Sequence, residues 1–102
     1  MSDTRFFIGQ QVRHLLFDYR GLIFDVDLEF NGTEQWYETM AKSRPPKDAP
    51  WYHVLVHGAD HTTYVAERNL EPYDGTDYID HPLLHELFDG FENGVYRRRG
   101  LG

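Results

Sequence analysis

The stretch Gly21-Leu-Ile-Phe-Asp-Val-Asp-Leu-Glu-Phe30 decides the fold class of this 102-residue chain. Large apolar side chains stand at every second position from Leu22 to Phe30, and the positions between them carry Ile23 and three carboxylates. Successive side chains of a β-strand point to opposite faces, so a period of two predicts a strand with one face toward a core. This is the strongest strand signal in the chain.

A shorter strand is predicted immediately before this one. Residues Gln11–Phe17 form the strand candidate, and Asp18-Tyr-Arg-Gly21 forms a turn that ends in a glycine, a residue that tolerates positive φ. The two strands should therefore form a hairpin. If Val12 and His14 share the core face of the first strand, His14 is a partly buried histidine with a hydrogen-bond partner.

A short helix is predicted after the central strand. Asn31-Gly32 is a turn signal, and Thr33–Lys42 follows it with its threonine as a plausible N-cap and with Trp36 and Met40 four residues apart. The polar, proline-bearing residues Lys42–Pro50 then form a loop within the domain.

A second hairpin follows this loop. Trp51–His57 and Thr62–Ala66 are predicted strands, and Gly58-Ala-Asp60 is the turn between them. Glu67–Leu70 then indicates a single helical turn.

Short, closely spaced strands without a long crossover helix predict an all-β fold, a small, partly open barrel of about five antiparallel strands. Because two hairpins alone are marginally stable, a fifth strand is expected from Phe6–Ile8 or from Leu70–Tyr73. A C-terminal helix is expected over about residues 82–89. We therefore expect one domain over residues 1–93 and a flexible, arginine-bearing tail over residues 94–102.

Composition limits the classes of function. The chain has no cysteine, which excludes disulfides, thiolate metal ligands and a cysteine nucleophile. Its net charge of -7 weighs against general affinity for DNA, so nucleic-acid binding would need a local basic patch. No apolar run is long enough to span a membrane, and we expect a soluble, cytoplasmic protein without a membrane partner.

The sequence carries little that points to catalysis. The three carboxylates of the central strand have no nucleophile or oxyanion donor beside them, so a solvated face is predicted. His57 and His61 flank the second turn and could hold zinc or nickel together with Asp60, or they could be two exposed hairpin residues. No phosphate loop or nucleophile elbow is present. We expect no enzyme activity, no catalytic residue, no cofactor and no bound metal.

Aromatic side chains near the second hairpin are candidates for partner binding. Residues 51–56 alternate two apolar faces, one led by Trp51 and His53 and the other by Tyr52. If the Tyr52 face is the core, Trp51 and His53 lie on the outer surface or the barrel rim, where aromatic side chains often anchor a partner. The alternative is that Trp51 seals the open end of the barrel.

Two arginines near the first turn complete the candidate site. Arg13 and Arg20 could form a small basic spot for a phosphate or for an acidic patch on a partner. The alternative is that they pair with Asp18 and Asp25. The predicted partner-binding residues are Arg13, Tyr19, Arg20, Trp51, Tyr52, His53, Tyr64 and Glu67.

The chain resembles the HspQ family, also described as the YccV-like or hemimethylated-DNA-binding domain. The resemblance rests on four strings: Gly9-Gln-Gln-Val-Arg-His14, Tyr19-Arg-Gly-Leu-Ile-Phe-Asp-Val-Asp27, Ala49-Pro-Trp-Tyr-His-Val-Leu-Val56 and Thr63-Tyr-Val-Ala-Glu-Arg-Asn-Leu70. It covers roughly residues 1–90, departs from the family in the middle loop at 31–48 and in the arginine tail, and implies a Src-homology-3-like barrel.

The resemblance also implies two functions of different classes. In the first, the protein is a heat-shock adaptor of the stress response that promotes degradation of selected proteins, such as the replication initiator DnaA, by the ATP-dependent Lon protease. In the second, it recognises hemimethylated DNA near the replication origin. Of the two functions, we expect the adaptor role, with Lon and its substrates as partners. DNA binding is the alternative. Uncovered sheet edges also favour a homo-oligomer.

Overall fold

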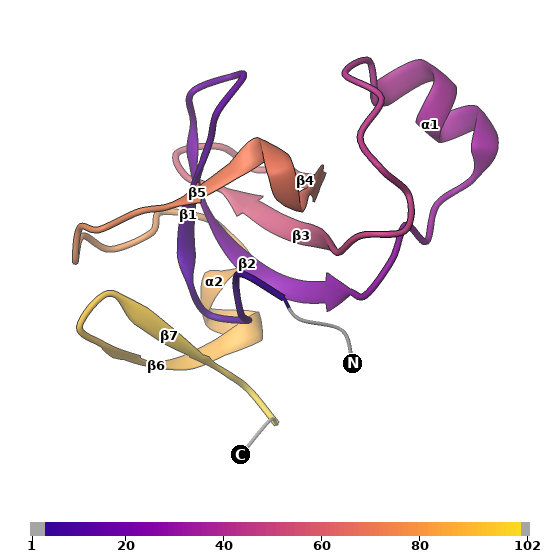
Figure 1. Cartoon of the computed structure of the whole chain (residues 1–102). Helices are drawn as coiled ribbons and strands as arrows, with labels where there is room; N and C mark the ends of the chain where they lie inside the picture. Colours follow the sequence, from indigo (N-terminus) through magenta and orange to yellow (C-terminus); the bar gives the residue numbers. More distant parts are fainter. Residues whose placement is uncertain (1–3, 101–102) are drawn as a thin grey trace.

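The computed structural model describes residues 4–100 and consists mainly of antiparallel strands (Figure 1). Five strands form one sheet in the order β4-β3-β2-β1-β5, and two more form a separate hairpin. The strands are β1 (Gln11–His14), β2 (Arg20–Asp27), β3 (Trp51–Val56), β4 (Thr62–Ala66), β5 (Leu70–Pro72), β6 (Phe88–Glu92) and β7 (Val95–Arg98). The predicted all-β, partly open barrel is confirmed.

Three short helices accompany the strands. They are α1 (Glu34–Met40), the 3-10 turn η1 (Glu67–Asn69) and α2 (Leu84–Leu87). The predicted cap of α1 is confirmed, since Thr33 Oγ1 accepts the Trp36 N–H at 3.0 Å. None of the helices within residues 4–100 has the length and apolar character needed to cross a membrane.

The pairing of the strands agrees with the two predicted hairpins. β1 pairs with β2, and β3 pairs with β4, both antiparallel. Of the two candidates for a fifth strand, the one after the second hairpin is correct, because β5 pairs with β1 and sets Leu70 opposite His14. The other candidate, Phe6–Ile8, is not a strand.

The turn before β2 is built differently from the prediction. Asp18, not Gly21, takes the positive φ, at 53°. Gly21 lies inside β2, where an added Cβ would stand 2.3 Å from Val54 Cγ1 and 2.8 Å from the Leu55 carbonyl oxygen. The glycine therefore permits the close approach of β2 to β3.

The central strand β2 is buried on both faces. Leu22 and Ile23 are each 0% exposed, although adjacent strand residues point to opposite sides. Ile23 belongs to a cluster with Val12 and Tyr52, whereas Leu22 belongs to a second cluster with Leu55. A strand buried on both sides needs a second covering layer, which the alternating pattern alone did not predict.

The predicted single apolar face from Leu22 to Phe30 is wrong beyond the middle of the strand. The register with β3 shifts between Ile23 and Asp25, which marks a β-bulge. The strand ends at Asp27, and Leu28 beyond it is 57% exposed.

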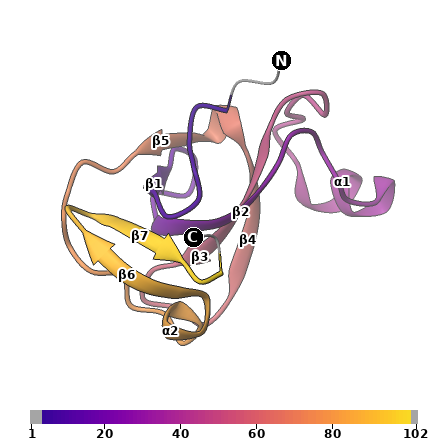
Figure 2. The same ribbon diagram turned by 90° about the horizontal axis from the view of Figure 1, so that it is seen from below.

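The C-terminal residues supply the second covering layer. The predicted helix over about 82–89 is shorter, covering only Leu84–Leu87, and the predicted flexible tail over 94–102 instead contains β7. Tyr96 in β7 is 6% exposed and its N–H donates to the Gly9 carbonyl at 2.9 Å. The domain therefore does not end at residue 93. Figure 2 shows α2 and the β6–β7 hairpin on one side of the molecule and α1 on the other.

Candidate partner-binding groove

A groove follows β4, which is one edge of the five-stranded sheet. Its cavity volume is about 630 Å³. One wall is the β1–β2 turn with Leu16 and Phe17, and the other is α1 and the segment after it, with Trp36 and Met40. In Figure 1 these two walls stand on either side of β4 at the top of the molecule. We call this feature the β4 groove.

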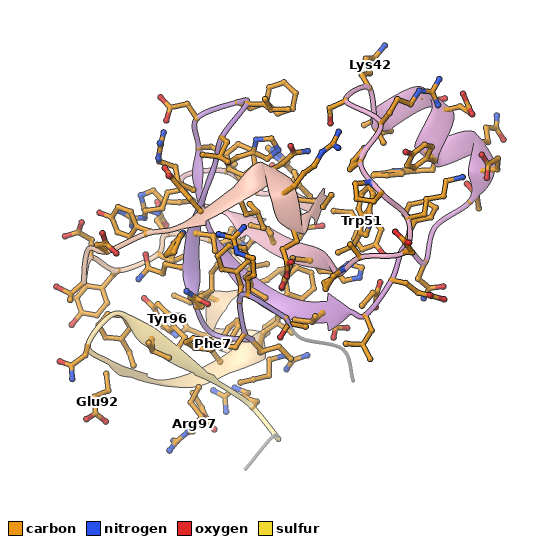
Figure 3. The ribbon with its side chains drawn as sticks, in the orientation of Figure 1. Phe7, Lys42, Trp51, Glu92, Tyr96 and Arg97 are labelled. Carbon is orange, nitrogen blue, oxygen red and sulfur yellow. The ribbon has the colours of Figure 1, made fainter. Side chains whose placement is uncertain are left out.

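The groove is rich in exposed apolar side chains. Leu16 is 56% exposed, Phe17 is 75% exposed and Met40 is 61% exposed. Lys42 stands at the top of the α1 wall and points away from the body of the protein (Figure 3). Exposed apolar side chains that gather around a recess mark interaction surfaces more often than scattered ones do.

Tyr19 joins the turn wall to the floor of the groove. Its hydroxyl lies 2.6 Å from Thr63 Oγ1 on β4. Burial raises the pKa of Tyr19 above its ordinary value of about 10, which favours further the protonated hydroxyl that already dominates near neutral pH. The contact holds the ring of Tyr19 across the sheet.

A second group of rings closes the other end of the groove. Asp27 Oδ2 accepts the Tyr64 hydroxyl at 2.7 Å and lies 3.0 Å from His53 Nε2. Burial, together with the hydrogen bond to Asp27, raises the pKa of Tyr64. The His53 and Tyr64 ring centres are 4.5 Å apart. Asp27 thus orients two rings toward the groove.

Trp51 lies beneath these rings and is not an exposed anchor. It is 1% exposed, and its Nε1 donates to the Pro46 carbonyl at 3.1 Å. Figure 3 places it where the α1 segment meets the strands. The hypothesis of an outer or rim position for Trp51 is wrong, because α1 covers that face, and the alternative of a seal agrees with its burial.

Tyr52 and Glu67 fasten the N-terminal segment to the sheet. The Tyr52 hydroxyl donates to Glu67 Oε2 at 2.6 Å and accepts the Phe6 N–H at 3.2 Å. Glu67 Oε2 also accepts the Arg5 N–H at 2.9 Å. Tyr52 is 0% exposed, so its ring offers no surface to a partner.

Arg13 is paired with acidic residues and is not a free basic group. It forms ion pairs with Asp18 and Glu71, and hydrogen bonds to these two carboxylates raise its pKa. This pairing with Asp18 is the alternative that the sequence left open. Asp25, the other partner considered, forms no ion pair with either arginine.

Arg20 stands opposite Arg13 across the β1–β2 pair, but its guanidinium is used inside the fold. It donates to the Tyr78 carbonyl and to the Tyr73 hydroxyl, and it lies 3.6 Å from Asp77 Oδ2. The two arginines are therefore neighbours, as a basic spot would require, but their carboxylate partners neutralise the pair.

The structure gathers half of the predicted partner-binding set in one place. Tyr19, Trp51, His53 and Tyr64 line the β4 groove, whereas Arg13, Arg20, Tyr52 and Glu67 do not. The wall residues and Thr62 are further lining residues that were not predicted from the sequence. The sequence contains one signal for the turn wall, the apolar run Leu15-Leu-Phe17 next to a polar turn. The predicted strand Gln11–Phe17 includes this run as its end.

Of the two histidines that flank the second turn, His57 makes a side-chain contact with a distant loop. His57 Nδ1 accepts the Asp80 N–H at 2.9 Å. In the part of the chain that the structure describes, no three histidine, aspartate or glutamate side chains converge in a way that could hold a metal ion. The hypothesis of a site at His57, His61 and Asp60 gains no support.

The structure is thus a small, partly open β-barrel with an aromatic groove along one sheet edge. A family model described as hemimethylated DNA-binding protein YccV like matches residues 4–95. The chain belongs to this YccV-like family, and the resemblance noted in the sequence is confirmed.

One wall of the groove is expected to respond to pH through His14. Its Nδ1 accepts the N–H groups of Leu16 and Phe17 at 3.1 and 3.2 Å, and burial lowers its pKa. In the unfolded chain a histidine has a pKa of about 6.5. Above this pH, His14 is neutral in both the folded and the unfolded state, so its titration costs the folded state no stability. As the pH falls through this value, the unfolded state binds the proton first and stability is lost.

Thermal melts from about pH 7.5 to about pH 5.5 should therefore show a falling Tm. His14→Asn keeps an acceptor without a titrating ring, and it should flatten this fall. His85→Asn, at an exposed histidine, is the control and should retain the slope of the parent. An unchanged slope in His14→Asn would contradict the prediction.

Proposed function

We propose that this protein is a non-catalytic adaptor that binds polypeptides in the β4 groove and promotes their degradation by the Lon protease. The observation that carries the proposal is the chemistry of the groove. The chain has 17 acidic residues, yet among residues 4–100 no aspartate or glutamate lines the groove. Its walls are instead aliphatic and aromatic, which suits apolar segments of a protein partner.

The basic residues support a protein partner over a nucleic acid. Five of the ten lie within 4 Å of a carboxylate: Arg13, Arg20, Arg44, Lys47 and Arg97. A neutralised guanidinium adds little to phosphate binding, and a net charge of -7 repels a duplex at long range.

Recognition of hemimethylated DNA is the second candidate, because the family description names it. The run Arg97-Arg-Arg99 at the end of the β6–β7 hairpin is the local basic feature that favours it. Within this run, Arg97 pairs with Asp89, and Arg98 and Arg99 donate to backbone carbonyls.

A degradation time course with purified Lon and DnaA as substrate tests the adaptor role. Adding this protein should raise the rate of substrate loss, and Leu16→Ser should remove most of the increase. Leu28→Ser is the matched control, because Leu28 is 57% exposed against 56% for Leu16 but lies outside the groove. Equal stimulation by both variants would place the functional surface elsewhere.

A duplex titration tests the DNA role. We expect weak binding near physiological salt to methylated, hemimethylated and unmethylated duplexes alike, with affinity that falls steeply as salt rises. Tight binding that depends on methylation and tolerates added salt would reverse the order of the two candidates.

A further inference from the structure

The two edges of the five-stranded sheet are built differently. β5 has three residues and contains Glu71 and Pro72, features that discourage pairing with another strand. β4 has five residues, Thr62-Thr-Tyr-Val-Ala66, without a charge or a proline, and its register with β3 has no shift. The β4 edge therefore lacks the protective features that are found at the β5 edge.

The backbone groups that face outward from β4 follow from the hydrogen bonds at its two ends. The Val56 N–H donates to the His61 carbonyl at 3.3 Å, and the Glu67 N–H donates to the Pro50 carbonyl at 3.0 Å. Antiparallel pairs alternate, so Thr62 and Tyr64 direct their N–H and C=O groups away from β3. Within residues 4–100, these outward groups have no hydrogen-bond partner.

We propose that β4 binds an extended, apolar segment of another polypeptide as an added strand. The segment would pair with the outward groups of Thr62 and Tyr64 and place its side chains against the two walls of the groove. This inference rests on the proposed adaptor function and states how the adaptor recognises its substrates.

The dimensions of the groove suit a single strand. β4 lines the groove along its whole length, and five residues span roughly 17 Å at about 3.3 Å per residue. The cavity of about 630 Å³ lies within the range of about 300–1,000 Å³ that is usual for ligand pockets. The occupant is therefore a segment of about five residues.

The lining also indicates the charge of the segment. Of the lining residues that the structure describes, Lys42 is the one with a fixed charge. A lysine or arginine on the segment would meet this cation and find no carboxylate in the groove, so an apolar segment without basic residues is favoured.

The β4 of a second copy does not fit this edge. β4 lies in a recess between the Leu16–Phe17 wall and α1, and the β4 of a second copy lies in the same recess. Two concave edges cannot approach each other, because their walls would collide before the backbones could pair. A free, extended chain has no such walls.

Fluorescence anisotropy with a fluorescein-labelled peptide of alternating valine and threonine tests the proposal. Thr62→Pro removes an N–H that points outward and makes no bond to β3, whereas Thr62→Ala keeps this N–H and removes the side chain. We expect Thr62→Pro to weaken peptide binding about ten-fold and Thr62→Ala to bind within about two-fold of the parent. Thermal melts establish that both variants are folded.

A modified probe provides an independent measurement. The same peptide with an N-methyl group on every backbone amide cannot donate the hydrogen bonds of an added strand, and it should not bind. Leu16→Ser should weaken binding of the unmodified peptide, whereas the matched variant Leu28→Ser should not.

Several outcomes would overturn strand addition. They are absence of peptide binding, equal binding by Thr62→Pro and Thr62→Ala, equal binding of the N-methylated peptide, or self-association in sedimentation runs that Thr62→Pro abolishes. If the protein does not stimulate Lon but the peptides bind as expected, the adaptor function is removed and strand addition stands. Conversely, Lon stimulation that Thr62→Pro does not reduce, together with peptides that do not bind as expected, would remove strand addition and leave the adaptor function standing.

Discussion

Trp51→Ala is expected to lower the free energy of unfolding by about 3–5 kcal/mol, the usual cost of truncating a large buried ring. The side chain is 1% exposed and packs against the rings of Phe30, Trp36 and Tyr64 at centroid distances of 4.9, 6.0 and 5.1 Å. Its removal leaves a cavity between α1 and the sheet. A domain of this size has only about 5–15 kcal/mol of stability, so the variant should melt at least about 12 °C below the parent.

Trp36→Ala is the matched control for this prediction. Trp36 belongs to the same aromatic cluster but is only partly buried and lines the groove wall. Trp36→Ala should lower the free energy of unfolding much less than Trp51→Ala does, and it should weaken peptide binding in the groove. If Trp51→Ala melts like the parent, the assignment of Trp51 as the seal between α1 and the sheet is wrong.

Ending the chain after Gly94 is expected to abolish cooperative unfolding or to lower the Tm by well over 10 °C, since β7 covers one face of the sheet. The cut removes Tyr96, whose ring packs with Phe88 in the cluster that buries Leu22 and Leu55. It also removes the hydrogen bond from the Tyr96 N–H to the Gly9 carbonyl. Differential scanning calorimetry on the truncated and full chains would measure the loss.

Tyr96→Phe separates the ring from its hydroxyl. The hydroxyl accepts the Ile79 N–H at 3.0 Å, so this variant should lose only about 1 kcal/mol. A truncated chain that melts like the full chain would return residues 94–102 to the flexible tail that the sequence indicated.

Local patterns were sufficient for the two central hairpins. The period of two in β2 and β3, the turn between β3 and β4, and the Thr33 cap of α1 all depend on neighbouring residues, and each was predicted. The pairing of β5 with β1 was one of two candidates, because a three-residue strand gives almost no periodic signal of its own.

The C-terminal hairpin depended on distant contacts and was missed. Gly90 and Gly94 are typical of a loose end, yet Gly94 is buried and φ is +84° at this residue. The strands on either side form because Phe88 and Tyr96 pack on Leu22, more than sixty residues away in the chain. No short stretch of the sequence carries a signal for this long-range contact.

The groove was predicted in part for a similar reason. Aromatic type alone pointed to Tyr19, His53 and Tyr64, which do line it. Phe17 and Met40 lie near these rings because the β1–β2 turn and α1 stand on either side of β4, and this arrangement is not visible in the sequence. The burial of Trp51 and Tyr52 on opposite faces of β3 likewise required both covering layers to be known.

The difference between the two borders of the sheet sets an upper limit on assembly. A filament built by joining sheets side by side needs every molecule to offer two compatible borders, one to receive and one to give. The border formed by Leu70-Glu-Pro72 lacks one amide hydrogen and carries a carboxylate, so it cannot serve as the second. Joining of sheets side by side therefore cannot propagate into a filament, and the proposed capture of a segment by β4 would pair one segment with one molecule.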